Sequence, residues 1–301
     1  MNAGDPVDFR CGTLAIVGRP NVGKSTLLNA LVGHKVSITS RKPQTTRHRI
    51  AGVLTREHAQ YVFIDTPGFQ RRQGGELNRL LNRTVRDALA AVDAVLLVVA
   101  AGDFAAADQA VLDLLPRKVP VFLVVNKSDR LPQPERMLPF LDRAARAFPF
   151  AETVPVSALK ARNLEELLRT LARYLPVQPP LFDAEALTDR SERFLAAELV
   201  REKVFRRLGA ELPYACAVTI DRFEELGALR RIHAAIVVNR RSHKAIVVGH
   251  GGAKLKEIAT AARADMEELF GGKVFLEVWV KVRADWMRDA GALRRLGLGD
   301  G

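Results

Sequence analysis

The stretch GRPNVGKST, residues 18–26, constrains the fold more than any other part of the chain. It carries the pattern G-x-x-x-x-G-K-[ST] through Gly18, Gly23, Lys24 and Ser25, between an apolar run, LAIV, and an amphipathic run, STLLNALV. A glycine loop that joins a strand to a helix directs backbone N–H groups and the helix N-terminus at a phosphate. The pattern therefore predicts a P-loop, in which Lys24 reaches the β- and γ-phosphates and Ser25 binds Mg²⁺.

The first half of the chain alternates apolar runs with amphipathic ones. After the glycine loop come YVFIDT, AVLLVVA, VPVFLVVN and TVPVSA, and the last is followed by NLEELLRTLARYL. Continuous β-branched runs separated by helices are typical of a mostly parallel sheet with helices on both faces. We therefore expect an α/β domain of the P-loop NTPase class over residues 1–176. Three prolines within residues 176–180 end its last helix and predict a linker at 177–189.

Residues 190–290 follow another order and predict a smaller α+β domain, with a tail at 291–301. SERFLAAELVREKVFRRLG predicts a helix that has Ser191 as N-cap and Gly209 as C-cap. YACAVTIDRF, RRIHAAIVVNR and KAIVVG predict strands, and AKLKEIATAARADMEELFGG predicts a helix that ends at Gly271. KVFLEVWVKVR alternates strictly, which predicts a half-buried strand, and we expect it to run antiparallel.

Two further motifs after predicted strands identify the base of the nucleotide. In NKSD, the Asp129 carboxylate can accept from both N1–H and the exocyclic amine of guanine, whereas adenine would leave a buried carboxylate unpaired. Asn126 would brace this loop, and the stem of Lys127 would lie along the base. The motif SALK would present backbone N–H groups to the guanine carbonyl, through Ser157, Ala158 and Leu159.

The motif DTPG closes the strand YVFI. Asp65 is positioned to hold Mg²⁺ through water, and Gly68 lets its backbone N–H approach the γ-phosphate. Each motif alone also fits a simple turn, but their order on successive strand ends indicates a guanine-nucleotide site. The predicted nucleotide-binding residues are Gly18, Asn21, Val22, Gly23, Lys24, Ser25, Thr26, Asp65, Gly68, Asn126, Lys127, Asp129, Ser157, Ala158 and Leu159.

With these motifs in this order, the chain resembles the translation-factor-related GTPases and, among them, the Era family, whose G domain is of the TrmE-Era-EngA type. QTTRHR, residues 44–49, looks like the first switch of that family, in which a threonine contacts Mg²⁺. We assign Thr46, with Thr45 as the alternative. The metal set is then Ser25, Thr46 and Asp65, and the catalytic set is Lys24, Thr46 and Gly68. Asn21 resembles an asparagine that helps relatives to hold a monovalent cation such as K⁺.

The position that orients the attacking water in Ras-type enzymes, directly after DxxG, is occupied here by Phe69. A phenyl ring cannot hydrogen-bond to water, and phosphoryl transfer depends on positioning and charge neutralisation. Gln70 lies one residue later, and its ability to substitute is left open. We expect slow intrinsic hydrolysis that is aided by a bound cation or by a partner.

A second glycine cluster lies in VVGHGGAKLKEIA, from Val247. It is not a P-loop, because no G-K-[ST] follows, and it fails the dinucleotide fingerprint, because Lys254 occupies the place of the third glycine. The remaining alternative is the G-x-x-G loop of a KH module, which clamps the backbone of about four single-stranded nucleotides. The predicted RNA-binding residues are Arg240, Arg241, Lys244, Gly249, His250, Gly251, Gly252, Lys254 and Lys256.

The order of elements around this loop resembles a type-II KH domain, and a G domain followed by a KH domain is the Era architecture. The resemblance extends from about Gly12 to about Trp286. It departs from many relatives at Gly251, where they carry a basic residue, and His250 can stand in for that residue only in part.

The charge and aromatic content indicate how RNA would be held. The net charge is +12, and residues 35–56 and 230–256 contain bases but no acids, which fits either a solvated face or a polyanion site. Because aromatic residues make up 6% of the chain, base stacking cannot be the main source of affinity. We expect an apolar groove lined by Ile246, Val248 and Ile258, unless these residues are plain core.

The Era resemblance implies a switch in which GTP and Mg²⁺ alter how the KH module meets RNA. The implied RNA is the 3′ end of 16S ribosomal RNA, the implied process is assembly of the 30S subunit, and DNA is not expected as a partner. The alternatives are a GTPase of another ribosome-assembly or tRNA-modification group, and a membrane-surface signalling GTPase with a C-terminal protein adaptor. RNA binding, unlike an adaptor contact, should weaken steeply with salt.

The chain has two cysteines and no apolar signal segment at its start, which predicts a cytoplasmic protein. The family is also reported to sit loosely at the inner face of the membrane. The stretch Ala197–Gly209 is basic and amphipathic enough to permit such contact.

Overall fold

The computed structural model describes residues 8–69, 76–102, 104, 106–131, 137–209, 212–284, 286 and 291. Gln70 and most of the predicted tail at 291–301 lie outside the described residues. The chain divides into two compact units, each described below by itself. The N-terminal unit contains residues 8–37 and 46–189, and the C-terminal unit contains residues 38–45 together with the chain from Arg190 onward.

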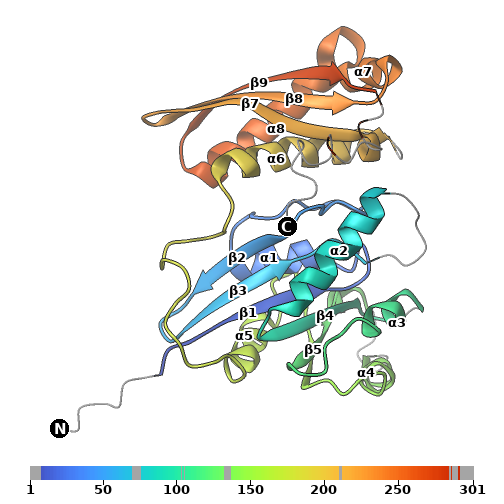
Figure 1. The fold of residues 1–301 in the computed structure, drawn as a ribbon, viewed down its shortest axis with the longest axis vertical. Coiled ribbons are helices and arrows are strands. Elements are labelled where there is room, and N and C mark those ends of the chain that lie inside the picture. The colour runs from blue at the N-terminus through green and yellow to red at the C-terminus, as the bar shows by residue number, and fades with distance from the viewer. Residues whose placement is uncertain are drawn as a thin grey trace, which may run out of the picture. The chain divides into compact units, whose positions relative to one another are not determined.

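The N-terminal unit is built on a six-stranded sheet with the order β2-β3-β1-β4-β5-β6 (Figure 1). All neighbouring strands pair in parallel except β2 and β3, which are antiparallel with Val53 opposite Val62. This confirms the expected P-loop α/β fold with a mostly parallel sheet. The strands are β1 (Arg10–Val17), β2 (Ile50–Thr55), β3 (Ala59–Asp65), β4 (Ala94–Ala100), β5 (Val121–Asn126) and β6 (Glu152–Pro155).

Helices cover both faces of this sheet. Because successive residues of a strand point to opposite sides, the central strands contribute to two cores. Ile16 and Leu96 belong to the core that packs on α1 and α5, whereas Val17 and Leu97 belong to the core that packs on α2, α3 and α4. Strands buried on both faces must be apolar throughout, which explains the continuous runs in the sequence. The helices are α1 (Lys24–Val32), α2 (Glu76–Ala90), α3 (Ala106–Leu112), α4 (Met137–Ala145) and α5 (Leu164–Ala172).

The proline-rich segment 177–189 packs on the N-terminal unit. The Gln60 side chain accepts hydrogen bonds from the backbone N–H groups of Leu181 and Phe182 and donates one to the Phe182 carbonyl. The Val53 N–H donates to the Leu187 carbonyl at 2.9 Å. The backbone of the segment is therefore hydrogen-bonded to strands β2 and β3, and the second unit begins after it, at Arg190.

The C-terminal unit packs its helices on a three-stranded sheet, β7-β8-β9. Ser191 is the N-cap of the first helix, since its Oγ accepts from the Phe194 N–H at 3.3 Å, and Gly271 ends α8 at a φ of 65°, as expected. The first helix ends at Arg207 with Leu208 as its C-cap, one residue before Gly209. The elements are α6 (Glu192–Arg207), β7 (Cys216–Leu226), β8 (Leu229–Val238), α7 (Arg241–Val248), α8 (Ala253–Phe270) and β9 (Lys273–Val282).

Besides the C-cap at Gly209, two expectations for this unit are wrong. KAIVVG is the end of helix α7, not a strand, because Val247 is buried in the core of the unit and this tertiary packing overrides the strand preference of its β-branched residues. Strand β9 runs parallel, not antiparallel, to β8, with Ala234 opposite Val278. Parallel neighbours need a long crossover, which helices α7 and α8 supply.

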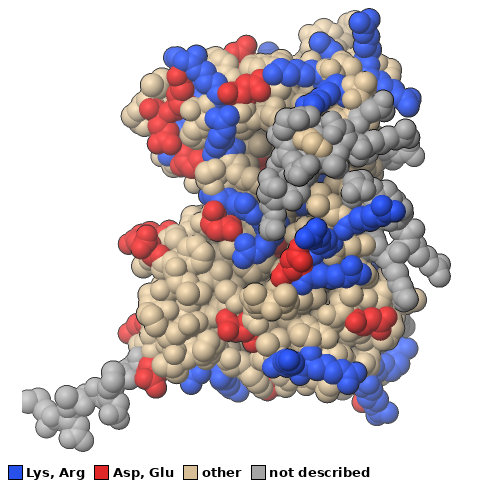
Figure 2. All heavy atoms as spheres, viewed as in Figure 1, with Lys and Arg blue, Asp and Glu red and all other residues tan. Residues whose placement is uncertain are grey.

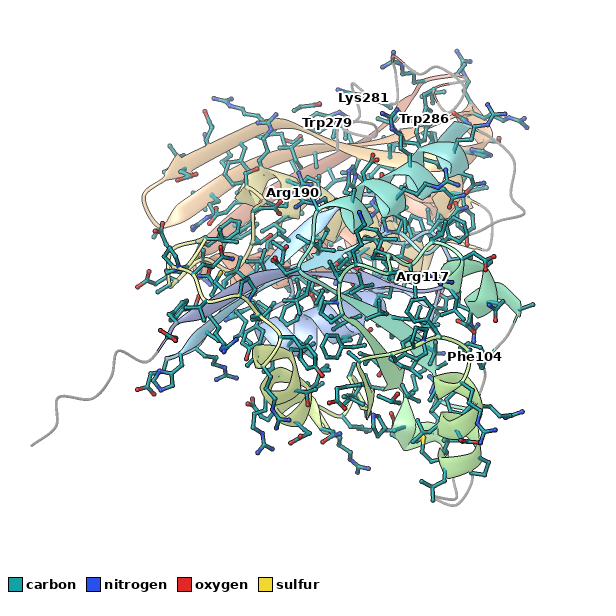
Figure 3. The ribbon with its side chains drawn as sticks, turned by 60° about the horizontal axis from the view of Figure 1, so that its bottom comes forward. Phe104, Arg117, Arg190, Trp279, Lys281 and Trp286 are labelled. Atoms are coloured by element: carbon teal, nitrogen blue, oxygen red, sulfur yellow. The ribbon has the colours of Figure 1, made fainter. Side chains whose placement is uncertain are left out.

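Strand β9 is half-buried, as its alternation predicts. Val274 and Val280 pack into the core, whereas Phe275 on the other face is 50% exposed. On that face the Lys281 ammonium lies 5.4 Å from the centre of the Trp279 ring, and the two residues are neighbours in Figure 3. The Lys281 ammonium also pairs with Asp221 at 2.6 Å.

Candidate functional site

The first glycine loop joins β1 to α1 and needs glycine for two separate reasons. Gly18 and Gly23 have φ values of 151° and 101°, which other residues rarely adopt. A Cβ on Gly23 would also lie 2.3 Å from Nδ2 of Asn126, and one on Gly18 would lie 2.4 Å from the carbonyl oxygen of Val98. The loop is therefore in close contact with the ends of β4 and β5.

The Lys24 side chain is held inside this loop. Its Nζ donates to the carbonyl oxygens of Gly18 and Arg19, both at 3.1 Å, and its side chain is buried. Burial lowers the pKa of Lys24 from 10.5 to about 8, although the nearby carboxylates of Asp65 and Asp108 oppose the shift. An ammonium group bonded only to carbonyls is well placed to exchange them for phosphate oxygens.

Three oxygen-bearing side chains meet beside the loop. Ser25 Oγ donates to Asp65 Oδ2 at 2.7 Å and lies 2.9 Å from Thr46 Oγ1, which is 3.5 Å from the same carboxylate oxygen. The other carboxylate oxygen, Oδ1, is buried and has no hydrogen-bond partner in the described part of the chain. Burial raises the pKa of Asp65, against Lys24 and the hydroxyl hydrogen bonds. An all-oxygen set with one orphaned carboxylate oxygen fits Mg²⁺.

Sequence reasoning missed two residues that belong to this cluster. Ser37 Oγ donates to Asp65 Oδ2 at 2.8 Å and is buried. Asn29 fixes Ser37, because its side chain accepts from the Ser37 N–H at 2.9 Å and donates to the Ser37 carbonyl at 2.7 Å. Neither residue stands in a recognisable motif. The only available signal was the position of Asn29 one turn beyond Ser25 on α1.

The alternative threonine points elsewhere. Thr45 Oγ1 donates to the Lys42 carbonyl at 2.7 Å, whereas Thr46 is the threonine that reaches Ser25 and Asp65. The geometry therefore favours Thr46 over Thr45 as the candidate ligand.

The motifs NKSD and SALK come together through Asn126. Its Oδ1 accepts from the backbone N–H groups of Lys127 and Ala158 at 2.8 and 3.0 Å, and its Nδ2 donates to the Val22 carbonyl at 3.0 Å. This one side chain links the phosphate loop to both base loops. The Lys127 ammonium reaches back to the Asn21 carbonyl.

The Asp129 carboxylate is exposed, which corrects the assumption that it is buried. Its Oδ1 accepts from Ser157 Oγ at 2.5 Å, and this hydrogen bond lowers the pKa of Asp129. The carboxylate is therefore fixed and ionised at neutral pH. The Leu159 side chain, in the SALK loop, is 69% exposed.

DTPG lies against the phosphate loop. A Cβ on Gly68 would lie 2.8 Å from three atoms of Pro20, so only glycine permits this approach. Phe69 is buried in the core under α2 and α3, and its side chain is therefore turned away from the site. Because Gln70 lies outside the described residues, its proposed role stays a prediction.

The second glycine loop connects α7 to α8 and lies on the surface. Gly249, Gly251 and Gly252 have φ values of 74°, 55° and 80°, and a Cβ on either of the last two would meet no atom within 4 Å. A Cβ on Gly249 would lie 2.8 Å from Cβ of Lys254, so this glycine is needed for packing. His250 is exposed. The turn leads directly into the N-terminus of α8, an 18-residue helix without acids in its first turn.

The predicted basic residues lie on the two helices that this turn connects, α7 with its N-cap Arg240 and the first turns of α8. Figure 2 shows blue side chains gathered over the end of the C-terminal unit that Figure 1 labels α7. In the described part of the chain none of them has an acidic partner within ion-pair distance, in contrast to Arg207, which pairs with Glu257. Cations without partners near a helix N-terminus favour a polyanion. They are Arg240, Arg241, Lys244, Lys254 and Lys256.

The three residues proposed to line an apolar groove differ in burial. Ile258 is fully buried core, Val248 is partly buried against that core, and Ile246 is 49% exposed. Among them only Ile246 offers a substantial apolar surface to a ligand. None of the helices in the described ranges is long and apolar enough to cross a membrane.

Comparisons with known proteins agree with this architecture. The 50S ribosome-binding GTPase family matches residues 13–127, and the KH domain family matches residues 211–287. GTPase Era of Nitrosomonas eutropha is 55% identical over 289 residues, which cover 96% of this chain and 98% of the relative. GTPase Era of Chromobacterium violaceum is 54% identical over 290 residues, with the same coverage of both chains.

Two solved structures extend the comparison to the complete fold. A variant of Era from Aquifex aeolicus bound to GDP and AlF4⁻ is 38% identical, with a TM-score of 0.93 over 97% of this chain and 100% of the other. Era in complex with MgGDPNP and nucleotides 1506–1542 of 16S ribosomal RNA has a TM-score of 0.92 at the same identity and coverage. Near-complete coverage of both domains at this identity shows that the chain belongs to the Era family of GTPases.

Proposed function

We propose that this GTPase binds GTP with Mg²⁺ in its N-terminal unit and single-stranded RNA at the α7–α8 turn, and that it acts in assembly of the 30S subunit. The proposed RNA is the 3′ end of 16S ribosomal RNA, because an Era relative is solved with that segment. Two observations in one chain carry the proposal. Asp65 beside the P-loop has a buried carboxylate oxygen without a hydrogen-bond partner, and the exposed α7–α8 turn has cations without acidic partners on its two helices.

In the nucleotide site we assign roles by geometry. Ser25, Thr46 and Asp65 would hold Mg²⁺, which when bound neutralises charge on the phosphates. Lys24 would exchange its carbonyl partners for phosphate oxygens, and the Gly68 N–H would approach the γ-phosphate. The Asp129 carboxylate, ionised and fixed by Ser157, would accept from the two donors of guanine. Asn21, exposed in the loop, would help to hold a K⁺ ion.

Hydrolysis by this site alone should be slow. Phe69 is buried in the core, so the residue that follows DTPG contributes no hydrogen bond to an attacking water. Catalysis would depend on Lys24, Thr46 and the Gly68 N–H, with a cation or a partner supplying the missing stabilisation. We place this activity in the cytoplasm.

We keep loose contact with the inner membrane face as a secondary part of the proposal, but the surface of α6 gives it little support. Glu198, Arg201, Glu202 and Lys203 on that helix are buried, so its charged residues are not a free basic face.

The decisive experiment measures binding of a labelled oligonucleotide with the sequence of the 16S ribosomal RNA 3′ end. Affinity is compared with GDP, with a non-hydrolysable GTP analogue and without nucleotide, over a series of salt concentrations, and a DNA oligonucleotide of the same sequence is the control. We expect tight RNA binding that weakens steeply with salt and is strongest with the GTP analogue. Equal affinity in the three nucleotide states would remove the switch, and salt-insensitive or absent RNA binding would favour a protein adaptor.

A further inference from the structure

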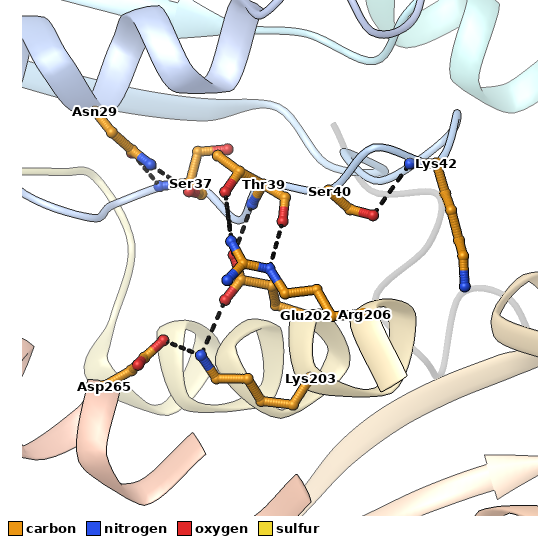
Figure 4. A network of polar contacts seen from close by, with 9 residues as sticks. All are labelled: Asn29, Ser37, Thr39, Ser40, Lys42, Glu202, Lys203, Arg206 and Asp265. Atoms are coloured by element: carbon orange, nitrogen blue, oxygen red, sulfur yellow. Dashed lines mark hydrogen bonds and ion pairs between the residues drawn. The ribbon is translucent and has the colours of Figure 1, made fainter. Parts of the chain in front are cut away.

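The first-switch segment, residues 38–45, packs with the C-terminal unit, although the chain on both sides of it belongs to the N-terminal unit. Its partner is helix α6 (Figure 4). The Thr39 N–H and hydroxyl donate to Glu202 Oε1 at 2.9 and 3.3 Å. In return the Arg206 guanidinium donates to the Thr39 carbonyl at 3.1 Å and to its hydroxyl oxygen at 2.9 Å. Every polar group of Thr39 is therefore bound to α6.

Lys42 makes the second anchor, at the C-terminal end of α6. Its Nζ donates to the carbonyl oxygens of Phe205, Leu208 and Gly209 at 2.7, 2.5 and 3.1 Å. The last carbonyls of a helix have no partner inside the helix, and the helix dipole places partial negative charge there. The ammonium group therefore caps α6 from outside the helix.

Thr45 makes the third anchor. Its carbonyl accepts from Arg201 Nη2 at 2.6 Å, and the same guanidinium is held by both carboxylate oxygens of Glu198, at 2.7 and 2.6 Å. The side chains of Arg201 and Glu198 are 4% and 7% exposed. Because Glu198 fixes the Nε and Nη2 edge of the guanidinium, the donor to the Thr45 carbonyl is held in one position.

The burial of Glu202 makes the contact between the segment and α6 energetically favourable. Its side chain is fully buried, and its other partners include Lys203 and Arg206. A buried carboxylate is costly unless its oxygens are hydrogen-bonded, and withdrawal of Thr39 would remove two of the hydrogen bonds that Glu202 Oε1 accepts. The helix therefore favours the docked segment over an undocked one.

The residue after the last anchor reaches the metal site. Thr46 lies 2.9 Å from Ser25 Oγ and 3.5 Å from Asp65 Oδ2, measured from its hydroxyl oxygen. A trans peptide keeps neighbouring Cα atoms about 3.8 Å apart, so a large shift of the Thr46 backbone toward a metal ion also moves Thr45. One segment is thus tied to α6 by Thr39, Lys42 and Thr45 and to the proposed Mg²⁺ position by Thr46.

We propose that α6 is the receptor for the first-switch segment, and that this contact carries the state of the nucleotide site to the RNA-binding unit. The proposal rests on the function proposed above and names the residues that regulate it. It requires that the segment docks on α6 with different affinity in the GTP and GDP states. Because such coupling is reciprocal, bound RNA must change the affinity for the GTP analogue by the same factor that the analogue changes the affinity for RNA.

The test uses the full-length protein with the substitution Glu202→Gln, which keeps the shape but removes the charge that Thr39 and Arg206 contact. Glu192→Gln is the matched control, because Glu192 is on the same helix and pairs with Arg230 at 2.5 Å, away from the segment. Lys42→Met is a second variant. Lys42 lies on the segment, so this change removes an anchor without removing a buried charge from α6. Folding is checked by circular dichroism and by GDP affinity.

The measured quantity is the ratio of RNA dissociation constants with GDP and with the GTP analogue. In the unmodified chain and in Glu192→Gln we expect a ratio of about five or more, which is typical of allosteric coupling. In Glu202→Gln and Lys42→Met it should fall close to one, while GDP affinity and nucleotide-free RNA affinity stay within about twofold. By reciprocity, RNA should change the preference of the unmodified chain for the analogue over GDP by the same factor, and this change should also disappear in the two variants.

The outcomes separate the two proposals. If folded Glu202→Gln and Lys42→Met keep the full ratio, α6 is only a structural support for the segment and the receptor proposal is overturned. If the unmodified chain binds RNA with a ratio of one, no coupling exists and the proposal is overturned while RNA binding stands. If the unmodified chain does not bind RNA, the proposed function itself has failed.

Discussion

The two glycine turns of this chain look alike in sequence but lie in opposite surroundings, the first in close contact with other atoms and the second open to solvent. In the loop at 18–23 the glycines avoid collisions, since a Cβ on Gly23 would lie 2.3 Å from Asn126. In the turn at 249–252 a Cβ on Gly251 or Gly252 would enter open space, and only the positive φ favours glycine. The first loop is closed around a compact site, whereas the second presents its backbone outward. A closed loop suits a small phosphate ligand, and an open turn suits a long polymer.

The strongest test of this contrast is Gly23→Ala. The methyl group would both strain the backbone at a φ of 101° and collide with Asn126, so we expect guanine-nucleotide affinity to fall roughly a hundredfold or more. Gly33→Ala is the control, because Gly33 also has a positive φ, at the other end of α1, but has nothing within 4 Å. Titration with fluorescent GDP measures both. Similar affinities for the two variants would mean that the close approach to Asn126 is not needed for binding.

The corresponding change in the open turn is Gly252→Asp. A carboxylate projecting into the space expected for the RNA backbone should reduce RNA affinity about tenfold or more and leave nucleotide affinity unchanged. Gly227→Asp introduces the same charge at a φ of 61°, in the turn between β7 and β8, and is the control for strain. Loss of RNA binding in both variants, or in neither, would contradict the assignment of the turn.

A smaller effect is expected from the cations beside the turn. Removing Lys254 and Lys256 together by alanine substitution should weaken RNA binding a few-fold. The slope of log affinity against log salt should become shallower by about one for each phosphate that these lysines neutralise. Lys281→Ala is the comparison, since its ammonium is already paired with Asp221. An unchanged slope in the double variant would show that these lysines do not bind phosphate.

The last predicted effect is a pH dependence of GDP affinity, which we expect for the closed loop because it contains Lys24. Burial lowers the pKa of Lys24 to about 8, so in the nucleotide-free protein the ammonium is lost as the pH rises through that value. In the unfolded chain Lys24 keeps its proton up to about pH 10.5, so the stability of the folded state should rise with pH between these two values. Phosphate favours the charged form, so GDP affinity should fall above pH 8, with proton uptake on binding. Calorimetry in two buffers measures the uptake, and the exposed turn at 249–252 should show no matching dependence.

Several parts of the fold could be predicted because their determinants are local. GxxxxGKS, DTPG, NKSD and SALK each follow an apolar run, and parallel strands bring their carboxyl ends to one edge of a sheet, so chain order alone assembles the nucleotide site. The caps at Ser191 and Gly271 were also predicted, since capping depends on one side chain or one positive φ.

Other parts could not be predicted, because long-range packing decides them. KAIVVG has the local preference of a strand and is a helix, since Val247 packs into the core of the C-terminal unit. The burial of Phe69 and of Ile258, the exposure of Asp129, and the contribution of Ser37 to the Asp65 cluster all depend on neighbours that are distant in the chain.

By itself, the sequence determined which chemistry this chain carries, because phosphate, metal and guanine recognition need particular residue types at fixed local spacing. Only the tertiary structure decided that residues 38–45 leave the N-terminal unit to dock on α6 through Thr39, Lys42 and Thr45. The physical reason is that Glu202 and Arg201, about 160 residues further along, are buried charges that need partners, and no local pattern records where a buried charge will find them.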